Sequence, residues 1–84
     1  MKKEDNRYYL VDNNKITAEV CFKIDNNVCD IYHTYVDPNY RGNGLAKILL
    51  DELLSDLEKK NIEAKATCSY ASSYLEKRNY VYNK

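Results

Sequence analysis

The start of the chain alternates between hydrophobic and polar positions, as β-strands with one buried face do. Residues 7–12, 15–24 and 28–36 are rich in the aromatic and β-branched residues that strands favour. Within residues 15–24, one expected face is apolar and the other mostly polar, with Ile16, Ala18, Val20 and Phe22 opposite Thr17, Glu19, Cys21 and Lys23. Residues 13–14 and 25–27 suit tight turns, because asparagine tolerates left-handed backbone. We therefore expect an antiparallel meander of three strands.

The period of the pattern changes in the middle of the chain. Residues 44–60 predict an amphipathic helix, because apolar residues recur there at steps of three and four: Leu45, Ile48, Leu49, Leu53 and Leu57. Residues 63–68 predict a short strand, and residues 69–78 predict a second helix with Ser69 or its neighbour as the N-cap. The predicted fold is α/β with a mixed sheet and the order βββαβα. A right-handed crossover then places the last strand parallel to the third. Open sheets of this kind bind ligands at the carboxyl ends of such strands.

Composition narrows the classes of function. The 84 residues fit a single small domain, 1–84. Thirteen Lys and Arg balance thirteen Asp and Glu, so the chain has no overall attraction to nucleic acid or to anionic membranes. No apolar stretch is long enough to span a membrane, and no signal segment follows the charged N-terminus. Three separate cysteines, none in a C-x-x-C pair, predict neither a disulfide framework nor a zinc site. We expect a cytoplasmic protein that is a monomer or weak dimer.

The segment between the third strand and the long helix holds every glycine and proline of the chain: Pro38, Gly42 and Gly44. Glycines permit a sharp turn and a close approach of the backbone to a ligand. The helix start that follows offers free amides and a partial positive charge that suit a phosphate, and Arg41 adds a permanent charge. The alternative is a plain tight turn. Neither the P-loop sequence nor the third glycine of a dinucleotide site is present, so nucleotide hydrolysis and nicotinamide binding are poorly supported.

Residues 36–46, V-D-P-N-Y-R-G-N-G-L-A, resemble the acetyl-CoA signature of the GNAT N-acetyltransferases. The core of that signature is [QR]-x-x-G-x-[GA], and Arg41, Gly44 and Ala46 meet it. The resemblance extends over about residues 5–82 and is greatest to a short, single-domain GNAT-like branch. That branch has a His-Thr-x-Val strand before the loop and a Cys-Ser-Tyr motif before the last helix, and here these motifs start at His33 and Cys68.

The resemblance implies an acetyl-CoA-dependent N-acetyltransferase that acts on an amine acceptor and uses no metal. In this family the loop amides hold the pyrophosphate of CoA, and the pantetheine lies beside the third strand like an added strand. The residues thereby implied in cofactor binding are Tyr35, Val36, Asp37, Arg41, Gly42, Asn43, Gly44, Leu45, Ala46, Ser69 and Tyr70.

Two residues are candidates for catalysis. Acetyl transfer needs a neutral amine and a proton for the leaving thiolate. His33, the single histidine, suits a general base, but strand alternation leaves open whether it is a core residue instead. Cys68 precedes a helix N-terminus, so it is an acyl-accepting nucleophile, a proton donor to the CoA thiolate, or a buried residue at a strand end. Cys21 and Cys29 are expected to be packing residues.

Some features of the family pattern are missing. Leu75 stands where the family has its general-acid tyrosine, and Tyr74 is one position, about 100° around the helix, away. The chain also lacks the two helices usually inserted between the first strands, and the final strand pair. The directly joined first strands leave the acceptor side open to a protein tail, another subunit or a larger partner. These departures also support the alternative of a CoA- or acyl-CoA-binding module with little or no turnover.

Overall fold

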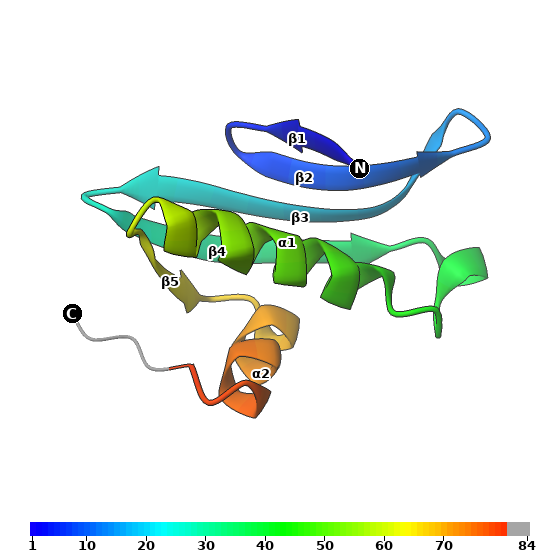
Figure 1. Cartoon of the computed structure of the whole chain (residues 1–84). Helices are drawn as coiled ribbons and strands as arrows, with labels where there is room; N and C mark the ends of the chain where they lie inside the picture. Colours follow the sequence, from blue (N-terminus) through cyan, green and yellow to red (C-terminus); the bar gives the residue numbers. More distant parts are fainter. Residues whose placement is uncertain (81–84) are drawn as a thin grey trace.

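The computed structural model describes residues 1–80, which fold into a five-stranded sheet and two α-helices (Figure 1). The elements in chain order are β1 (Lys2–Glu4), β2 (Arg7–Asp12), β3 (Lys15–Asp25), β4 (Val28–Val36), a 3₁₀ turn η1 (Pro38–Tyr40), α1 (Leu45–Lys59), β5 (Glu63–Ala66) and α2 (Ser69–Lys77). The strands lie side by side in numerical order. Pairing is antiparallel from β1 to β4 and parallel between β4 and β5. The predicted mixed sheet and order of elements are confirmed, with β1 added before them.

The two hairpin turns use asparagine as the sequence predicts. Asn13 and Asn14 have φ angles of 52° and 62°, and Asn26 and Asn27 have the same pair of values. Positive φ at both central residues matches the right-handed twist of the flanking strands. Each turn therefore joins its strands directly, and β2 runs into β3 without an intervening helix.

The short edge strand β1 was not predicted, because all three of its residues are charged and exposed. It pairs with β2, and one of its side chains reaches across to α1. Lys3 Nζ lies 2.5 Å from a carboxylate oxygen of Glu52 and 2.9 Å from one of Asp56. These contacts depend on a helix about fifty positions away, which the local pattern does not reveal.

Both helices cover the same face of the sheet. α1 packs across β3, β4 and β5, and α2 packs against β4 and β5. Between them lies a continuous core: Tyr8, Ala18, Val20, Phe22, Cys29, Ile31, Leu49, Leu50, Leu53, Leu54, Leu57, Ala64, Ala71, Tyr74 and Leu75. In residues 1–80 no helix covers the opposite face of the sheet (Figure 1). Neither α1 nor α2 has the length and apolar character to cross a membrane.

A bulge in β3 changes which side chains are buried. Leu10 pairs with Ala18 and Val11 pairs with Ile16, so Thr17 has no partner on β2. Thr17 is buried, and its hydroxyl donates a hydrogen bond to the Leu10 carbonyl at 3.3 Å. The expected faces are therefore wrong at this end of the strand, where Thr17 points inward and Ile16 is half-exposed. The extra residue shifts the alternation by one position.

Candidate functional site

The parallel strands β4 and β5 pair over only part of their length. Their last pair is Ile31 with Ala66, and β4 then continues to Val36 paired with β3 but not with β5. The Ile31 carbonyl accepts hydrogen bonds from the amides of Thr67 at 3.1 Å and Cys68 at 3.4 Å, which turns the chain away from the sheet. The predicted strand to residue 68 therefore ends two residues early, because the amides of Thr67 and Cys68 both bond to the Ile31 carbonyl and do not pair further along β4. The end of β4 and the start of α2 separate at this point.

A second bulge lies in β4, directly after the last residue that pairs with β5. Cys21 pairs with His33 and Phe22 pairs with Ile31, so Tyr32 has no partner on β3. Tyr32 and His33 are both exposed as a result, and Thr34 returns to the side of the helices. Its hydroxyl oxygen is 3.4 Å from Cys68 Sγ. The bulge therefore decides that Thr34 meets the cysteine while His33 does not.

The loop after β4 is tied down at its first residue. Asp37 accepts a hydrogen bond from the Asn39 amide at 2.8 Å, and its own amide donates to the Thr17 carbonyl at 2.8 Å. The ammonium of Lys15 lies 2.9 Å from the Asp37 carboxylate and, with the Asn39 amide, holds the pKa of Asp37 below its usual value. The loop is thereby fixed against β3 before it reaches the glycines.

The glycines shape the start of α1. Gly42 and Gly44 have φ angles of +87° and +70°, a region that other residues rarely adopt. Gly44 is the N-cap of α1 and supplies no side chain to the first-turn amides, and the first helical bond runs from the Ile48 amide to the Gly44 carbonyl. A Cβ added at either glycine would meet no other atom within 4 Å. The amides of residues 45–47 thus lie at the positive end of the helix dipole without a side-chain cap, which is a geometry suited to phosphate.

A pocket of about 290 Å³ joins this loop to the end of β4 and to α2. It is lined by Thr34, Tyr35, Val36, Tyr40, Arg41, Gly42, Gly44, Leu45, Ala46 and Tyr70. Eight of these residues are among those expected to contact the cofactor. Thr34 and Tyr40 were not expected, although strand alternation from Val36 would have indicated Thr34.

Three of the expected cofactor-binding residues do not line this pocket. Asp37 is buried against Lys15. The side-chain amide of Asn43 donates to the Tyr40 carbonyl at 3.1 Å, which closes the loop on itself. Ser69 is exposed and lines a neighbouring groove between the two helices.

The three cysteines have different environments. Burial acts to raise the pKa of Cys68, but the hydroxyl of Thr34 and the nearby backbone amides of Tyr70 and Ala71 outweigh it, so the pKa lies below its usual value. Cys29 is fully buried, and burial raises its pKa to about 12. Cys21 is half-buried, and burial raises its pKa as well. Of the three thiols, Cys68 is the one whose pKa is lowered, and it lies beside the pocket.

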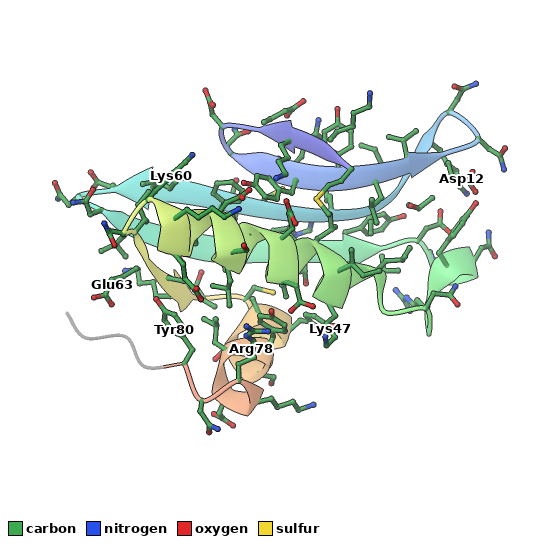
Figure 2. The ribbon with its side chains drawn as sticks, in the orientation of Figure 1. Asp12, Lys47, Lys60, Glu63, Arg78 and Tyr80 are labelled. Atoms are coloured by element: carbon green, nitrogen blue, oxygen red, sulfur yellow. The ribbon has the colours of Figure 1, made fainter. Side chains whose placement is uncertain are left out.

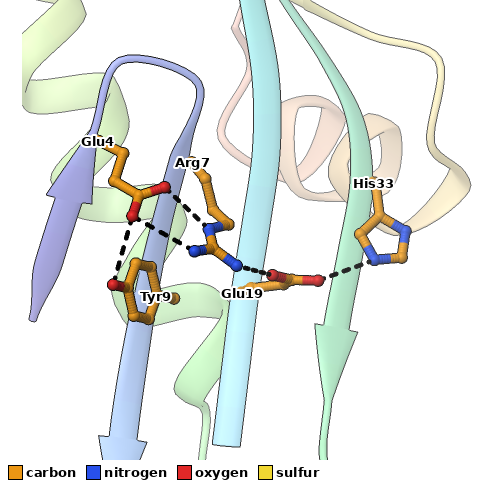
Figure 3. A network of polar contacts seen from close by, with 5 residues as sticks. All are labelled: Glu4, Arg7, Tyr9, Glu19 and His33. Atoms are coloured by element: carbon orange, nitrogen blue, oxygen red, sulfur yellow. Dashed lines mark hydrogen bonds and ion pairs between the residues drawn. The ribbon is translucent and has the colours of Figure 1, made fainter. Parts of the chain in front are cut away.

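His33 lies outside the core. Its side chain is 48% exposed, and its Nε2 atom is 3.4 Å from a carboxylate oxygen of Glu19 (Figure 3). The other oxygen of Glu19 accepts from Arg7 at 3.2 Å, and Arg7 in turn binds Glu4. This chain of contacts runs over the face of the sheet that the helices leave uncovered. His33 therefore presents its ring on the side of β4 opposite to the pair of Thr34 and Cys68.

Tyr74, which is adjacent to the position of the family's general acid, is engaged in a hydrogen bond to α1. The hydroxyl of Tyr74 donates to Asp51 of α1, and burial followed by this bond raises the pKa of Tyr74. Leu75 is in the core. Tyr70, one helical turn earlier, is 47% exposed and lines the pocket. Within the described part of the chain, no group of three His, Cys, Asp or Glu side chains is placed to hold a metal ion.

Comparisons of the sequence and of the structure with known proteins point to the same family. Residues 7–84 match the family described as GCN5-related N-acetyl-transferase. A GCN5-like protein from Staphylococcus aureus, solved by NMR, is 31% identical with a TM-score of 0.80, and the match covers 99% of this chain and 88% of that one. No curated protein matches significantly.

Two longer enzymes share the fold. The ribosomal-protein-S18-alanine N-acetyltransferase of Escherichia coli is 27% identical with a TM-score of 0.63, and the match covers 73% of this chain and 40% of that one. The PaiA N-acetyltransferase of Thermoplasma acidophilum, solved in complex with coenzyme A, is 21% identical with a TM-score of 0.68, and the match covers 87% of this chain and 50% of that one. This chain therefore spans half or less of either enzyme.

Proposed function

This chain belongs to the GCN5-related N-acetyltransferase family, and on that premise we propose that it binds acetyl-CoA and transfers the acetyl group to an amine. The observation that carries the proposal is the pocket itself. It connects free amides at the start of α1 to the point where β4 leaves β5, and Cys68 lies at that point. We assign this chain to the short GNAT-like branch, on the His-Thr-Tyr-Val and Cys-Ser-Tyr motifs that flank the pocket.

The glycine loop is proposed to hold the pyrophosphate. The amides of residues 45–47, the open space above Gly42 and Gly44, and the guanidinium of Arg41 all favour an anion there. The pantetheine would then extend along the end of β4, past Tyr35 and Val36. This part of β4 pairs with β3 on one side only, because β5 has already ended on the other. This places the thioester near Cys68.

The chemistry needs two proton movements. The amine nitrogen attacks the thioester carbonyl and gives up a proton, while the carbon–sulfur bond breaks and the CoA thiolate takes one up. For an amine with a pKa near 10.4, losing the first proton at about pH 7.5 costs roughly 4 kcal/mol. His33 presents its ring on the face of the sheet opposite to Thr34 and Cys68, so we propose that the amine loses this proton to solvent rather than to His33.

Cys68 has two possible parts in the reaction. As a thiolate it takes the acetyl group from CoA and passes it to the amine, and as a thiol it protonates the leaving CoA. The lowered pKa favours the first route, because it increases the fraction of the thiolate, which is the nucleophilic form. In that route the acetyl group is bound to Cys68 between the two half-reactions, and free CoA is released before the amine is consumed.

A second candidate function is a binding module that holds CoA or acyl-CoA with little turnover. The burial of Leu75 and the engagement of Tyr74 with Asp51 favour it, because neither residue supplies an acid to the pocket. The two functions make the same prediction for binding and opposite predictions for chemistry.

Titration of the ¹⁵N-labelled protein with acetyl-CoA tests binding. We expect selective shifts of the amide resonances of residues 36–46 and 68–74. The absence of shifts at millimolar acetyl-CoA would refute both functions.

Intact mass then separates the two functions. After incubation with acetyl-CoA, the acetyl-transfer route predicts a gain of one acetyl group that is lost in Cys68→Ala and kept in the control Cys21→Ala. CoA release in the presence of a panel of amines and peptides measures turnover. Binding with neither covalent acetylation nor CoA release would leave the binding module as the function.

A further inference from the structure

The hairpin between β2 and β3 contacts the loop that the proposed function assigns to the pyrophosphate. Asp12 is the last residue of β2 and Lys15 is the first residue of β3, so they stand on either side of the two-residue turn. Asp12 lies at the end of the sheet where the loop after β4 begins (Figure 2). The sequence predicts only a tight turn here, and the structure adds contacts that the turn does not require.

Two side chains of the hairpin hold two side chains of the loop. The hydroxyl of Tyr40 donates to a carboxylate oxygen of Asp12 at 2.7 Å. The ammonium of Lys15 is 2.9 Å from the Asp37 carboxylate and 5.9 Å from the centre of the Tyr40 ring. We call these four residues the hairpin anchor. Because Asp37 is the N-cap of η1 and Tyr40 is its last residue, the hairpin anchor holds the 3₁₀ turn at both ends.

Tyr40 connects the hairpin anchor to the glycines. Its amide donates to the Asp37 carbonyl at 2.8 Å, and its carbonyl accepts from the side-chain amide of Asn43 at 3.1 Å. Asn43 stands between Gly42 and Gly44, and a Cβ added at either glycine would meet no other atom within 4 Å. Side-chain packing therefore gives the glycines no support at these positions, and the conformation of this segment depends on the contacts of Tyr40.

We propose that Asp12 is a positioning residue for the cosubstrate, because through the hydroxyl of Tyr40 it holds the glycine loop in the conformation that binds the pyrophosphate. This rests on the proposed function. Asp12 does not line the pocket, and a carboxylate repels an anion, so its contribution is to the position of the loop and not to attraction. A loop that is held before the ligand arrives loses less conformational freedom on binding, which raises affinity.

Calorimetric titration with CoA of the wild-type chain, Tyr40→Phe, Asp12→Ala and the double variant tests this role. Tyr40→Phe keeps the ring that lines the pocket and removes only the hydroxyl. We expect it to weaken CoA binding about three- to tenfold, the effect of one hydrogen bond. In the Asp12→Ala background the same change should have no further effect, because the hydroxyl has already lost its acceptor. The charge of Asp12 cancels in this second comparison, since both proteins lack it.

The second hairpin supplies a matched control. Asp25 precedes an asparagine pair at the opposite end of β3, just as Asp12 does, with the same φ angles in the turn. In the Asp25→Ala background, Tyr40→Phe should keep its full effect. Asp12→Asn retains an oxygen that accepts from the hydroxyl, so there Tyr40→Phe should keep part of its effect. Tyr32→Phe, which changes an exposed tyrosine outside the pocket, should leave the affinity for CoA unchanged.

The outcomes separate this inference from the proposed function. Failure of the wild-type chain to bind CoA would refute the proposed function and this inference together. If the wild-type chain binds CoA and Tyr40→Phe weakens binding equally with and without Asp12, or not at all, the role of Asp12 is overturned and CoA binding stands. Alkylation of Cys68 by iodoacetamide should keep its rate in Tyr40→Phe, because the contacts of the thiol come from Thr34 and α2. A changed rate would mean that the variant disturbs the whole pocket, which would also overturn the inference.

Discussion

At the scale of single residues, the environment of each thiol decides what it can do. Cys29 is buried in the core, where the charged form is disfavoured. Burial, followed by the Glu19 carboxylate, raises the pKa of Cys21, and the opposing charge of Arg7 is too weak to reverse this. Cys68 has the hydroxyl of Thr34 on one side and the first amides of α2 on the other. Its reactivity therefore depends on a residue from β4 that is remote in the sequence.

Replacing Thr34 with valine should raise the pKa of Cys68. The lost hydrogen bond favours the thiolate by about 1 kcal/mol, so alkylation by iodoacetamide at pH 7 should slow by about three- to tenfold. The pH profile of the alkylation rate should shift to higher pH, and the maximal rate at high pH should stay the same. Mass spectrometry of the modified peptide measures the rate at Cys68, and the rate at Cys21 in the same sample is the internal control. An unchanged profile would mean that the α2 amides alone set the pKa.

At the scale of elements, the sequence predicts best what a short stretch decides by itself. The hairpin turns follow from asparagine pairs, and α1 follows from its apolar stripe, so both lie within a residue of their predicted limits. The bulges at Thr17 and Tyr32 depend on the register between two strands, which no single segment contains. The early end of β5 likewise depends on how β5 pairs with β4.

The residues of the candidate site also differ in whether a short stretch of sequence predicts them. The glycine loop could be identified locally, because Gly42, Gly44 and Arg41 are adjacent in the sequence and most of the expected residues line one pocket. The meeting of Thr34 with Cys68 and the ion pair of His33 with Glu19 arise from strands that pair in space. Side chains expected at the cofactor, such as Asp37, are used instead to fix the loop.

The attachment of α1 to the sheet gives a prediction for stability. Tyr8 of β2 donates to Asp56 of α1 at 2.6 Å, and this bond together with Lys3 lowers the pKa of Asp56. Tyr8→Phe should reduce the free energy of unfolding at pH 7 by about 1 kcal/mol. A carboxyl group with a lowered folded pKa stabilises the fold above its unfolded pKa of about 3.9 and loses that effect as pH falls through the folded pKa. The difference from wild type should therefore shrink in acid.

Urea unfolding followed by circular dichroism across a pH series measures this difference. Tyr32→Phe is the matched control, because Tyr32 is exposed on the uncovered face of the sheet, and it should leave stability unchanged at every pH. If the loss of unfolding free energy in Tyr8→Phe stays constant down to pH 2, the effect comes from packing and not from the bond with Asp56.

At the scale of the whole molecule, a formal charge of zero conceals an uneven distribution. Arg41 lines the pocket, and Lys47, Lys77 and Arg78 line an adjoining cavity between α1 and α2. Four cations are thus gathered where the start of α1 meets α2, while Asp51 is the carboxylate that pairs with two of them. A neutral chain can therefore attract an anionic cosubstrate to one end without a general affinity for polyanions.

Ligand binding at this end should stabilise the entire fold, because the pocket combines β4, the loop and both helices. Acetyl-CoA at about 100 times its Kd adds roughly 2.7 kcal/mol, which for a domain of this size raises Tm by about 10 to 20 °C. Arg41→Glu reverses a charge at the loop, and a tenfold weaker affinity would cut the stabilisation to about half. Lys23→Glu makes the same change of net charge on exposed β3 and should keep the full shift. Differential scanning calorimetry with and without acetyl-CoA measures all three proteins. Equal shifts in Arg41→Glu and Lys23→Glu would remove Arg41 from the binding site.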